Sequence, residues 1–138
     1  MAELKTQLTK EDARVFLASI PDERRRADAR IVCDILAGVT GEPPEMWGKA
    51  IVGFGRRHLR YESGRELDWM EIGFSPRKAN TAIYLSGGLD IYADLLARLG
   101  QHKTGGGCLY LRSVGDVDSA VLEELFTRSV AQVRMSNG

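Results

Sequence analysis

The side chains best suited to bind a ligand in this chain are cations and aromatic rings near the ends of predicted strands. Arg77 and Lys78 follow Pro76 in a short turn, and the proline ring stiffens that turn because it fixes φ. Such a turn presents both cations in a defined direction, which suits the capture of a carboxylate or phosphate. His102 and Lys103 form a second basic pair, just before a glycine-rich loop.

We expect these cations to surround one pocket for a small anion or another small molecule at the strand ends. Trp47 and Phe54 would supply its apolar walls, and Ser75 would lie beside them. Asp28 is a further candidate, because it falls within the apolar arc of a predicted helix and a buried carboxylate needs a partner. Arg77 or Lys78 could be that partner; alternatively, the helix overhangs the core edge and Asp28 stays in water.

The sequence contains no recognisable motif for catalysis or for a metal centre. Neither His58 nor His102 has paired carboxylates at the sequence spacing of metal ligands, so the sequence contains no zinc-binding pattern. Ser75 precedes a proline outside any GxSxG motif. Cys33 and Cys108 are too distant for a CxxC motif, and we expect two small buried thiols. We therefore predict a binding domain with no catalytic residue and no metal ligand.

Hydrophobic periodicity predicts the elements that must position these side chains. Helical spacing covers residues 9–20, with Thr9 as N-cap, and residues 22–38, 90–99 and 118–134. Short segments rich in β-branched and aromatic residues predict strands over 49–55, 57–61, 67–75, 80–86 and 108–112. The predicted order is ααββββαβα. This is an α+β fold in which an antiparallel sheet of about five strands packs against helices, in a single domain over 1–138.

Alternation along these strands sorts their side chains into two faces. The predicted core face carries the apolar residues Met70, Ile72, Phe74, Ile83, Leu85, Leu109 and Leu111. The opposite face would carry Trp69, Tyr84 and Tyr110 together with His58, Arg60, Glu71, Cys108 and Arg112. Three interpretations of this aromatic face remain open. A helix or loop covers it, it forms a homodimer interface, or it is a platform for a ligand or single-stranded nucleic acid.

The charge balance bears on the choice of partner. The 138 residues contain 19 Lys plus Arg and 19 Asp plus Glu, so no large polyanion is expected and nucleic acid is not the predicted partner. Residues 49–78 nevertheless hold seven basic and four acidic side chains, which leaves room for a local anion site. No apolar run approaches the length of a membrane span, and residues 1–10 lack the core of a signal peptide. We expect a cytoplasmic protein without a membrane partner.

Five motifs occur in an order that resembles the YdhG-like family of small bacterial domains of unknown function. They are EPPEMWG at 42–48, IVGFG at 51–55, GFSPRK at 73–78 after Trp69, LGQHKTG at 99–105 and CLYL at 108–111. The likeness extends from about Val15 to Val130. It implies one compact α+β domain. It does not assign an activity to any particular residue of this chain.

The resemblance also adds an alternative function, because some members of that family are described as frataxin-like iron chaperones. Iron would then bind surface carboxylates, and the nearest acidic ridge consists of Asp116, Asp118, Glu123 and Glu124. The leading hypothesis remains a non-enzymatic domain that binds a small anion or small molecule. The iron chaperone and a homodimeric scaffold that uses the Trp69, Tyr84 and Tyr110 face are the alternatives.

Overall fold

The computed structural model describes residues 8–60 and 62–137 of the chain. The helices are α1 (Ala13–Ala18), α2 (Glu23–Thr40), α3 (Ala93–Leu99) and α4 (Ser119–Asn137), with short 3₁₀ turns η1 (Leu89–Tyr92) and η2 (Val114–Asp116). The strands are β1 (Pro44–Trp47), β2 (Ile51–Phe54), β3 (Arg57–Arg60), β4 (Glu66–Trp69), β5 (Ile72–Pro76), β6 (Thr81–Tyr84), β7 (Lys103–Gly105) and β8 (Cys108–Leu111). None of the helices so described is long and apolar enough to cross a membrane.

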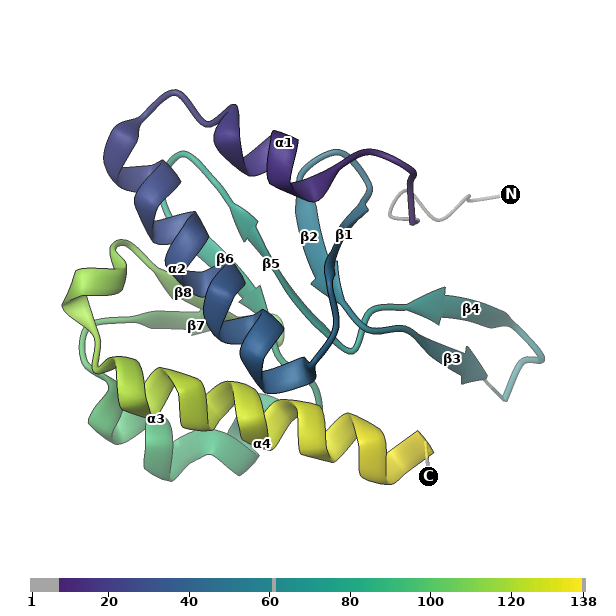
Figure 1. The fold of residues 1–138 in the computed structure, drawn as a ribbon. Coiled ribbons are helices and arrows are strands. Elements are labelled where there is room, and N and C mark those ends of the chain that lie inside the picture. The colour runs from purple at the N-terminus through teal and green to yellow at the C-terminus, as the bar shows by residue number, and fades with distance from the viewer. Residues whose placement is uncertain (1–7, 61, 138) are drawn as a thin grey trace.

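Six of these strands form one antiparallel sheet in the order β1-β2-β5-β6-β8-β7, and β3 pairs only with β4. The β3–β4 hairpin extends away from the body of the domain (Figure 1). The predicted α+β class and antiparallel sheet are confirmed, but the described residues contain eight strands where about five were expected. β1 and β7 were not predicted, and the segment 67–75 is two strands, β4 and β5.

Short polar side chains define where the helices begin. Asp12 caps α1, because its carboxylate accepts hydrogen bonds from the backbone N–H groups of Arg14 at 2.8 Å and Val15 at 3.3 Å. The helix therefore starts four residues after the predicted cap, Thr9. Asp22 caps α2 in the same way, and Gly41, at a φ of 72°, ends that helix in the left-handed conformation that glycine adopts without strain.

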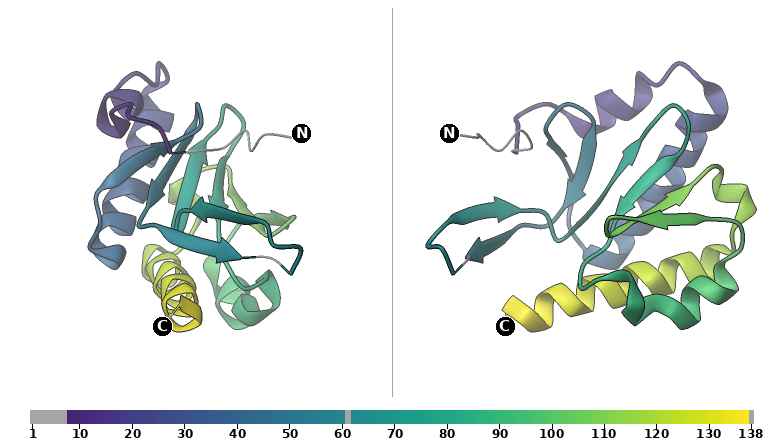
Figure 2. Two further views of the ribbon diagram at one scale, coloured as in Figure 1. Left: turned by 90° about the vertical axis from the view of Figure 1, so that its right-hand side faces the viewer. Right: turned by 180° about the vertical axis from the view of Figure 1, so that it is seen from behind.

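The hydrophobic core lies between the helices and one face of the six-stranded sheet, and Figure 2 shows α2 along one side of that sheet. α2 packs on β2 and β5, α4 packs on α2, and α3 packs on α4. Alternate strand residues supply the sheet side of the core, as predicted for Ile72, Phe74, Ile83, Leu109 and Leu111. Because strand side chains alternate, the residues between them point to the other face, which we call the open face.

Part of the open face is filled by side chains that lie over two glycines, Gly53 and Gly73. Trp47 and Met70 are each 1% exposed, and both sit where a Cβ on Gly53 would be. The sulfur of Met70 likewise lies over Gly73. Trp69 of the hairpin packs edge-on against Trp47, with ring centroids 5.8 Å apart. This arrangement anchors the base of the hairpin to β1, β2 and β5.

The prediction that Met70 faces the helices and Glu71 faces away was wrong for both residues. Met70 lies on the open face, whereas Glu71 pairs with Arg134 of α4 at 3.1 Å. The physical reason is the break between β4 and β5, since any interruption of strand pairing resets the alternation of side chains.

Candidate ligand-binding face

The two predicted apolar walls, Trp47 and Phe54, lie on opposite faces of the sheet. Phe54 is fully buried in the core beneath the helices, and Trp47 is buried on the open face under Trp69. They therefore line no common pocket. The indole Nε1 of Trp47 is buried without a hydrogen-bond partner among the described residues.

Ser75 is buried and has a structural partner. Its Oγ donates a hydrogen bond of 2.8 Å to the carbonyl oxygen of Ala50, in the turn between β1 and β2. The adjacent carbonyl of Pro76 accepts a hydrogen bond from Arg25 of α2 at 3.4 Å. This end of β5 is consequently tied to the β1–β2 turn and to α2, which fixes the direction in which the chain leaves the strand.

Arg77 extends over the open face and contacts two tyrosines. Its Nη2 donates a hydrogen bond of 3.1 Å to Tyr84 Oη, and its guanidinium carbon lies 6.0 Å from the centroid of the Tyr110 ring. Ala82 pairs with Tyr110 in the register of β6 and β8 and is completely buried, so the larger side chains around it close over this small residue. We call Arg77, Tyr84 and Tyr110 the Arg77 cluster.

The Arg77 cluster is electropositive, and its cation stays charged. The hydrogen bond to Tyr84 raises the pKa of Arg77 above its already high usual value. Lys103 lies directly opposite Tyr110 in the pairing of β7 with β8, so it shares the same face. Arg112 follows Tyr110 by two residues and is exposed, with Asp116 3.9 Å away as its ion-pair partner.

The remaining predicted site residues lie outside this cluster. Lys78 is exposed in the turn after β5. The Nδ1 of His102 lies 2.7 Å from the carbonyl oxygen of Gly100, which ties the ring to its own loop. Asp28 is half-buried and accepts a hydrogen bond from the backbone N–H of Val114 at 3.2 Å. The partner of Asp28 is thus the first amide of η2, and neither Arg77 nor Lys78.

The predicted aromatic face is split between the hairpin and the sheet. Trp69 belongs to the hairpin base, while Tyr84, Cys108 and Tyr110 lie half-buried on the open face. Both cysteines are free, and burial raises the pKa of the Cys33 thiol. The expectation of two buried thiols therefore holds for Cys33 and only in part for Cys108.

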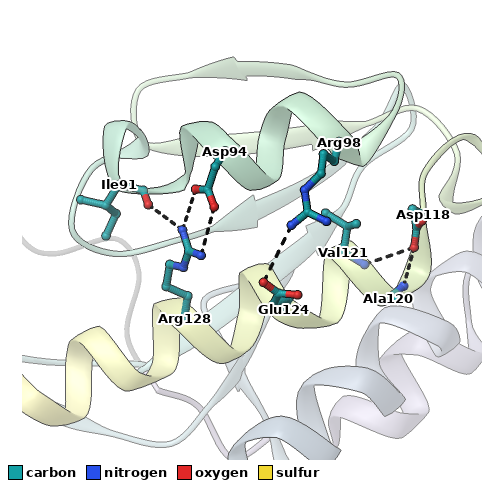
Figure 3. Close-up of polar contacts among 8 residues, drawn as sticks. All are labelled: Ile91, Asp94, Arg98, Asp118, Ala120, Val121, Glu124 and Arg128. Carbon is teal, nitrogen blue, oxygen red and sulfur yellow. Dashed lines mark hydrogen bonds and ion pairs between the residues drawn. The ribbon is translucent and has the colours of Figure 1, made fainter.

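Two carboxylates of the predicted acidic ridge, Asp118 and Glu124, have partners within the protein, as Figure 3 shows. Asp118 caps α4 by accepting hydrogen bonds from two backbone N–H groups at 2.9 and 3.2 Å. Glu124 lies 3.9 Å from Arg98. Arg128 forms a two-bond contact with Asp94 at 2.8 and 3.3 Å, which lowers the pKa of that carboxyl. The described part of the chain contains no group of three His, Cys, Asp or Glu side chains that could hold a metal ion.

Comparison of the chain with models of known protein families, with curated proteins and with solved structures finds no match.

Proposed function

We propose that this domain is a non-enzymatic binding module that takes a small anion with a planar group on its open face. The observation that carries the proposal is the Arg77 cluster, in which the guanidinium group contacts two tyrosine side chains on the sheet face opposite α2. We also propose that the domain is cytoplasmic and that it belongs to the YdhG-like family, which its sequence motifs resemble.

The chemistry of the cluster supports an anion that also stacks. Arg77 has five N–H donors, and its hydrogen bond to Tyr84 engages one Nη group, so donors remain for a carboxylate or phosphate. Tyr84 and Tyr110 offer half-buried rings on which a planar group could lie. Lys103 adds a second positive charge at the edge. The balanced total charge argues for a small anion in preference to a nucleic acid.

The anion proposal ranks above the iron chaperone because of how the acidic side chains are used. Asp118 and Glu124 are occupied by a helix cap and an ion pair, and Asp116 faces Arg112. A hard cation would have to compete with each of these interactions for its oxygen ligands.

Calorimetric titration with benzoate and adenosine monophosphate tests the proposal. We expect both to bind the wild-type domain, and adenosine, which lacks the anion, to bind at least about tenfold more weakly. Arg77→Ala should remove most of the affinity, and Lys78→Ala should have a smaller effect because Lys78 is exposed outside the cluster. Arg65→Ala, an exposed arginine in the β3–β4 loop, is the matched control. Equal affinity of wild type and Arg77→Ala would overturn the proposal.

A homodimer is a second candidate, favoured by the shape of the hairpin. Two-stranded hairpins are marginally stable in water on their own, yet among the described strands β3 and β4 pair only with each other. Leu59 and Leu67 lie opposite one another on that arm and are half-buried. A second copy would cover them. Light scattering should then show a wild-type dimer and a Leu67→Asp monomer, whereas a wild-type monomer at all concentrations would exclude this function.

A further inference from the structure

A cavity of about 570 Å³ lies between α1 and α2, in the helical layer. We call it the α1–α2 groove. Its volume falls within the range of roughly 300–1,000 Å³ that is usual for small-molecule sites. The groove belongs to different elements from the Arg77 cluster, so the two places can be tested separately.

The floor of the groove is apolar and neutral. Leu17 of α1 and Ala27 and Cys33 of α2 contribute to it. Leu17 and Cys33 are almost completely buried, at 5% and 1% exposure. Burial raises the pKa of the Cys33 thiol, and the charge of Arg14 only partly opposes that effect. The thiol therefore stays protonated near neutral pH, where it acts as a small hydrophobic surface.

Three arginines line the groove above this floor. Arg14 comes from α1, and Arg26 and Arg30 come from α2, where a spacing of four residues puts both on the same side of the helix. Arg26 donates a hydrogen bond of 2.7 Å to the carbonyl oxygen of Ile20, which closes the turn between the two helices. Arg26 is thus a fixed positive charge at the end of the groove.

The other two guanidinium groups are available to a ligand. Within the described residues, neither Arg14 nor Arg30 has a hydrogen-bond or ion-pair partner through its side chain. Glu23 and Asp34 also line the groove, but neither comes within ion-pair distance of an arginine there. Cations outnumber carboxylates in the lining by three to two, and two of the cations are uncompensated at contact distance.

We infer that the α1–α2 groove binds an organic acid with a short apolar body. Arg14 and Arg30 would hold the carboxylate, and the body would lie on Leu17, Ala27 and Cys33. A guanidinium group matches a carboxylate through paired hydrogen bonds, and an apolar floor favours a ligand whose other end is hydrocarbon. Both halves of such a ligand then find a complementary surface in one cavity.

Nuclear magnetic resonance titration of the whole chain with octanoate tests this inference. Acetate supplies the charge without the body, and octan-1-ol supplies the body without the charge. We expect octanoate to shift the amide signals of Leu17 and Cys33, and both comparison compounds to bind at least about tenfold more weakly.

Variants distinguish recognition of the carboxylate from nonspecific hydrophobic binding. The double variant Arg14→Gln/Arg30→Gln should weaken octanoate binding at least about tenfold. Arg24→Gln is the matched control, because Arg24 is an exposed arginine of the same helix that does not line the groove. Ala27→Phe should block the floor, and since Ala27 is exposed, the variant should still fold, as its amide spectrum will show.

Three results would overturn the inference: unchanged affinity in the double arginine variant, equal binding of octan-1-ol and octanoate, or shifts confined to the amides of Tyr84 and Tyr110. The last result would indicate that the acid binds the Arg77 cluster. Arg77→Ala should leave octanoate binding at the groove intact, so failure of the proposed function and failure of this inference are distinguishable.

Discussion

Replacing Gly53 by alanine should destabilise the domain, because a tryptophan occupies the space above that glycine. A Cβ at Gly53 would lie 2.6 Å from Cδ1 and 2.7 Å from Nε1 of Trp47, and 2.9 Å from Cβ of Met70. The indole ring is rigid and packs against Trp69, and the Met70 Cβ is fixed to the backbone, so a new methyl group must displace a packed ring or the backbone. Overpacking of this kind costs about 1–3 kcal/mol, and three contacts below 3.0 Å favour the upper half of that range.

Gly38 provides a matched control for the same substitution. It lies within α2, and nothing lies within 4 Å of a Cβ placed on it. Alanine is a better helix former than glycine and restricts the unfolded chain, so Gly38→Ala should stabilise the domain by about 0.4–1 kcal/mol. The same chemical change is thus expected to have opposite signs at two positions, because Gly38 lies in a helix with open space above it and Gly53 lies in a strand under packed side chains.

A double-mutant cycle with Trp47→Phe tests the cause of the effect at Gly53. Because the buried Nε1 of Trp47 has no hydrogen-bond partner among the described residues, phenylalanine sacrifices no such bond there. The smaller ring makes room for the new methyl group. We therefore expect Gly53→Ala/Trp47→Phe to be at least about 1 kcal/mol more stable than the sum of the single variants implies.

Urea unfolding followed by circular dichroism measures all of these free energies in one assay. A Gly53→Ala variant within about 0.5 kcal/mol of wild type, or an additive cycle, would show that Trp47 does not clash with the new methyl group. A destabilised Gly38→Ala variant would refute the comparison of the two glycines.

Two further predictions concern charged side chains. Asp28→Ala should cost about 1 kcal/mol in urea unfolding without changing benzoate affinity, since it removes the hydrogen bond to Val114 N–H; a loss of binding alone would contradict this. Hydrogen bonds to Asp68 and, to a smaller extent, to Glu66 raise the pKa of His58. The charged ring therefore stabilises the hairpin fully below its unfolded pKa of about 6.5. This stabilisation is lost as the pH rises through the higher pKa of the folded state. The protection factors of the β3 and β4 amides, which correct for the base-catalysed rise of intrinsic exchange with pH, should fall over that range in wild type but not in His58→Gln. An equal fall in both would exclude the ring as the cause.

The strands whose alternation is uninterrupted were predictable from the sequence. Ile83 and Leu109 face the core as expected because hydrophobic residues at every second position can bury only one face. The hairpin was harder to foresee, since residues 67–75 read as one continuous strand. The split after Trp69 coincides with the packing of Trp47 and Met70 over Gly53, which is a contact between segments distant in the sequence.

In the candidate sites, too, the sequence identified individual residues, whereas the fold decided which of them lie together. Arg77, Tyr84 and Tyr110 were identified individually from the sequence, whereas their meeting on one face follows from the pairing of β5, β6 and β8. Arg26 and Arg30 show the spacing of one helix face, which is the only sequence signal of the α1–α2 groove. Arg14 joins them solely because α1 folds back on α2.

By itself, the sequence determined the α+β class, the helix and strand periods and the balanced charge, because these depend on residues that are near one another in the chain. Tertiary structure alone decided which predicted site residues share a surface. It buried Phe54 beneath the helices, engaged Ser75 and Asp28 with backbone groups, and left Arg77 on the open face. The reason is physical: strand order and the side on which a helix packs are set by contacts between distant segments, which local patterns do not encode.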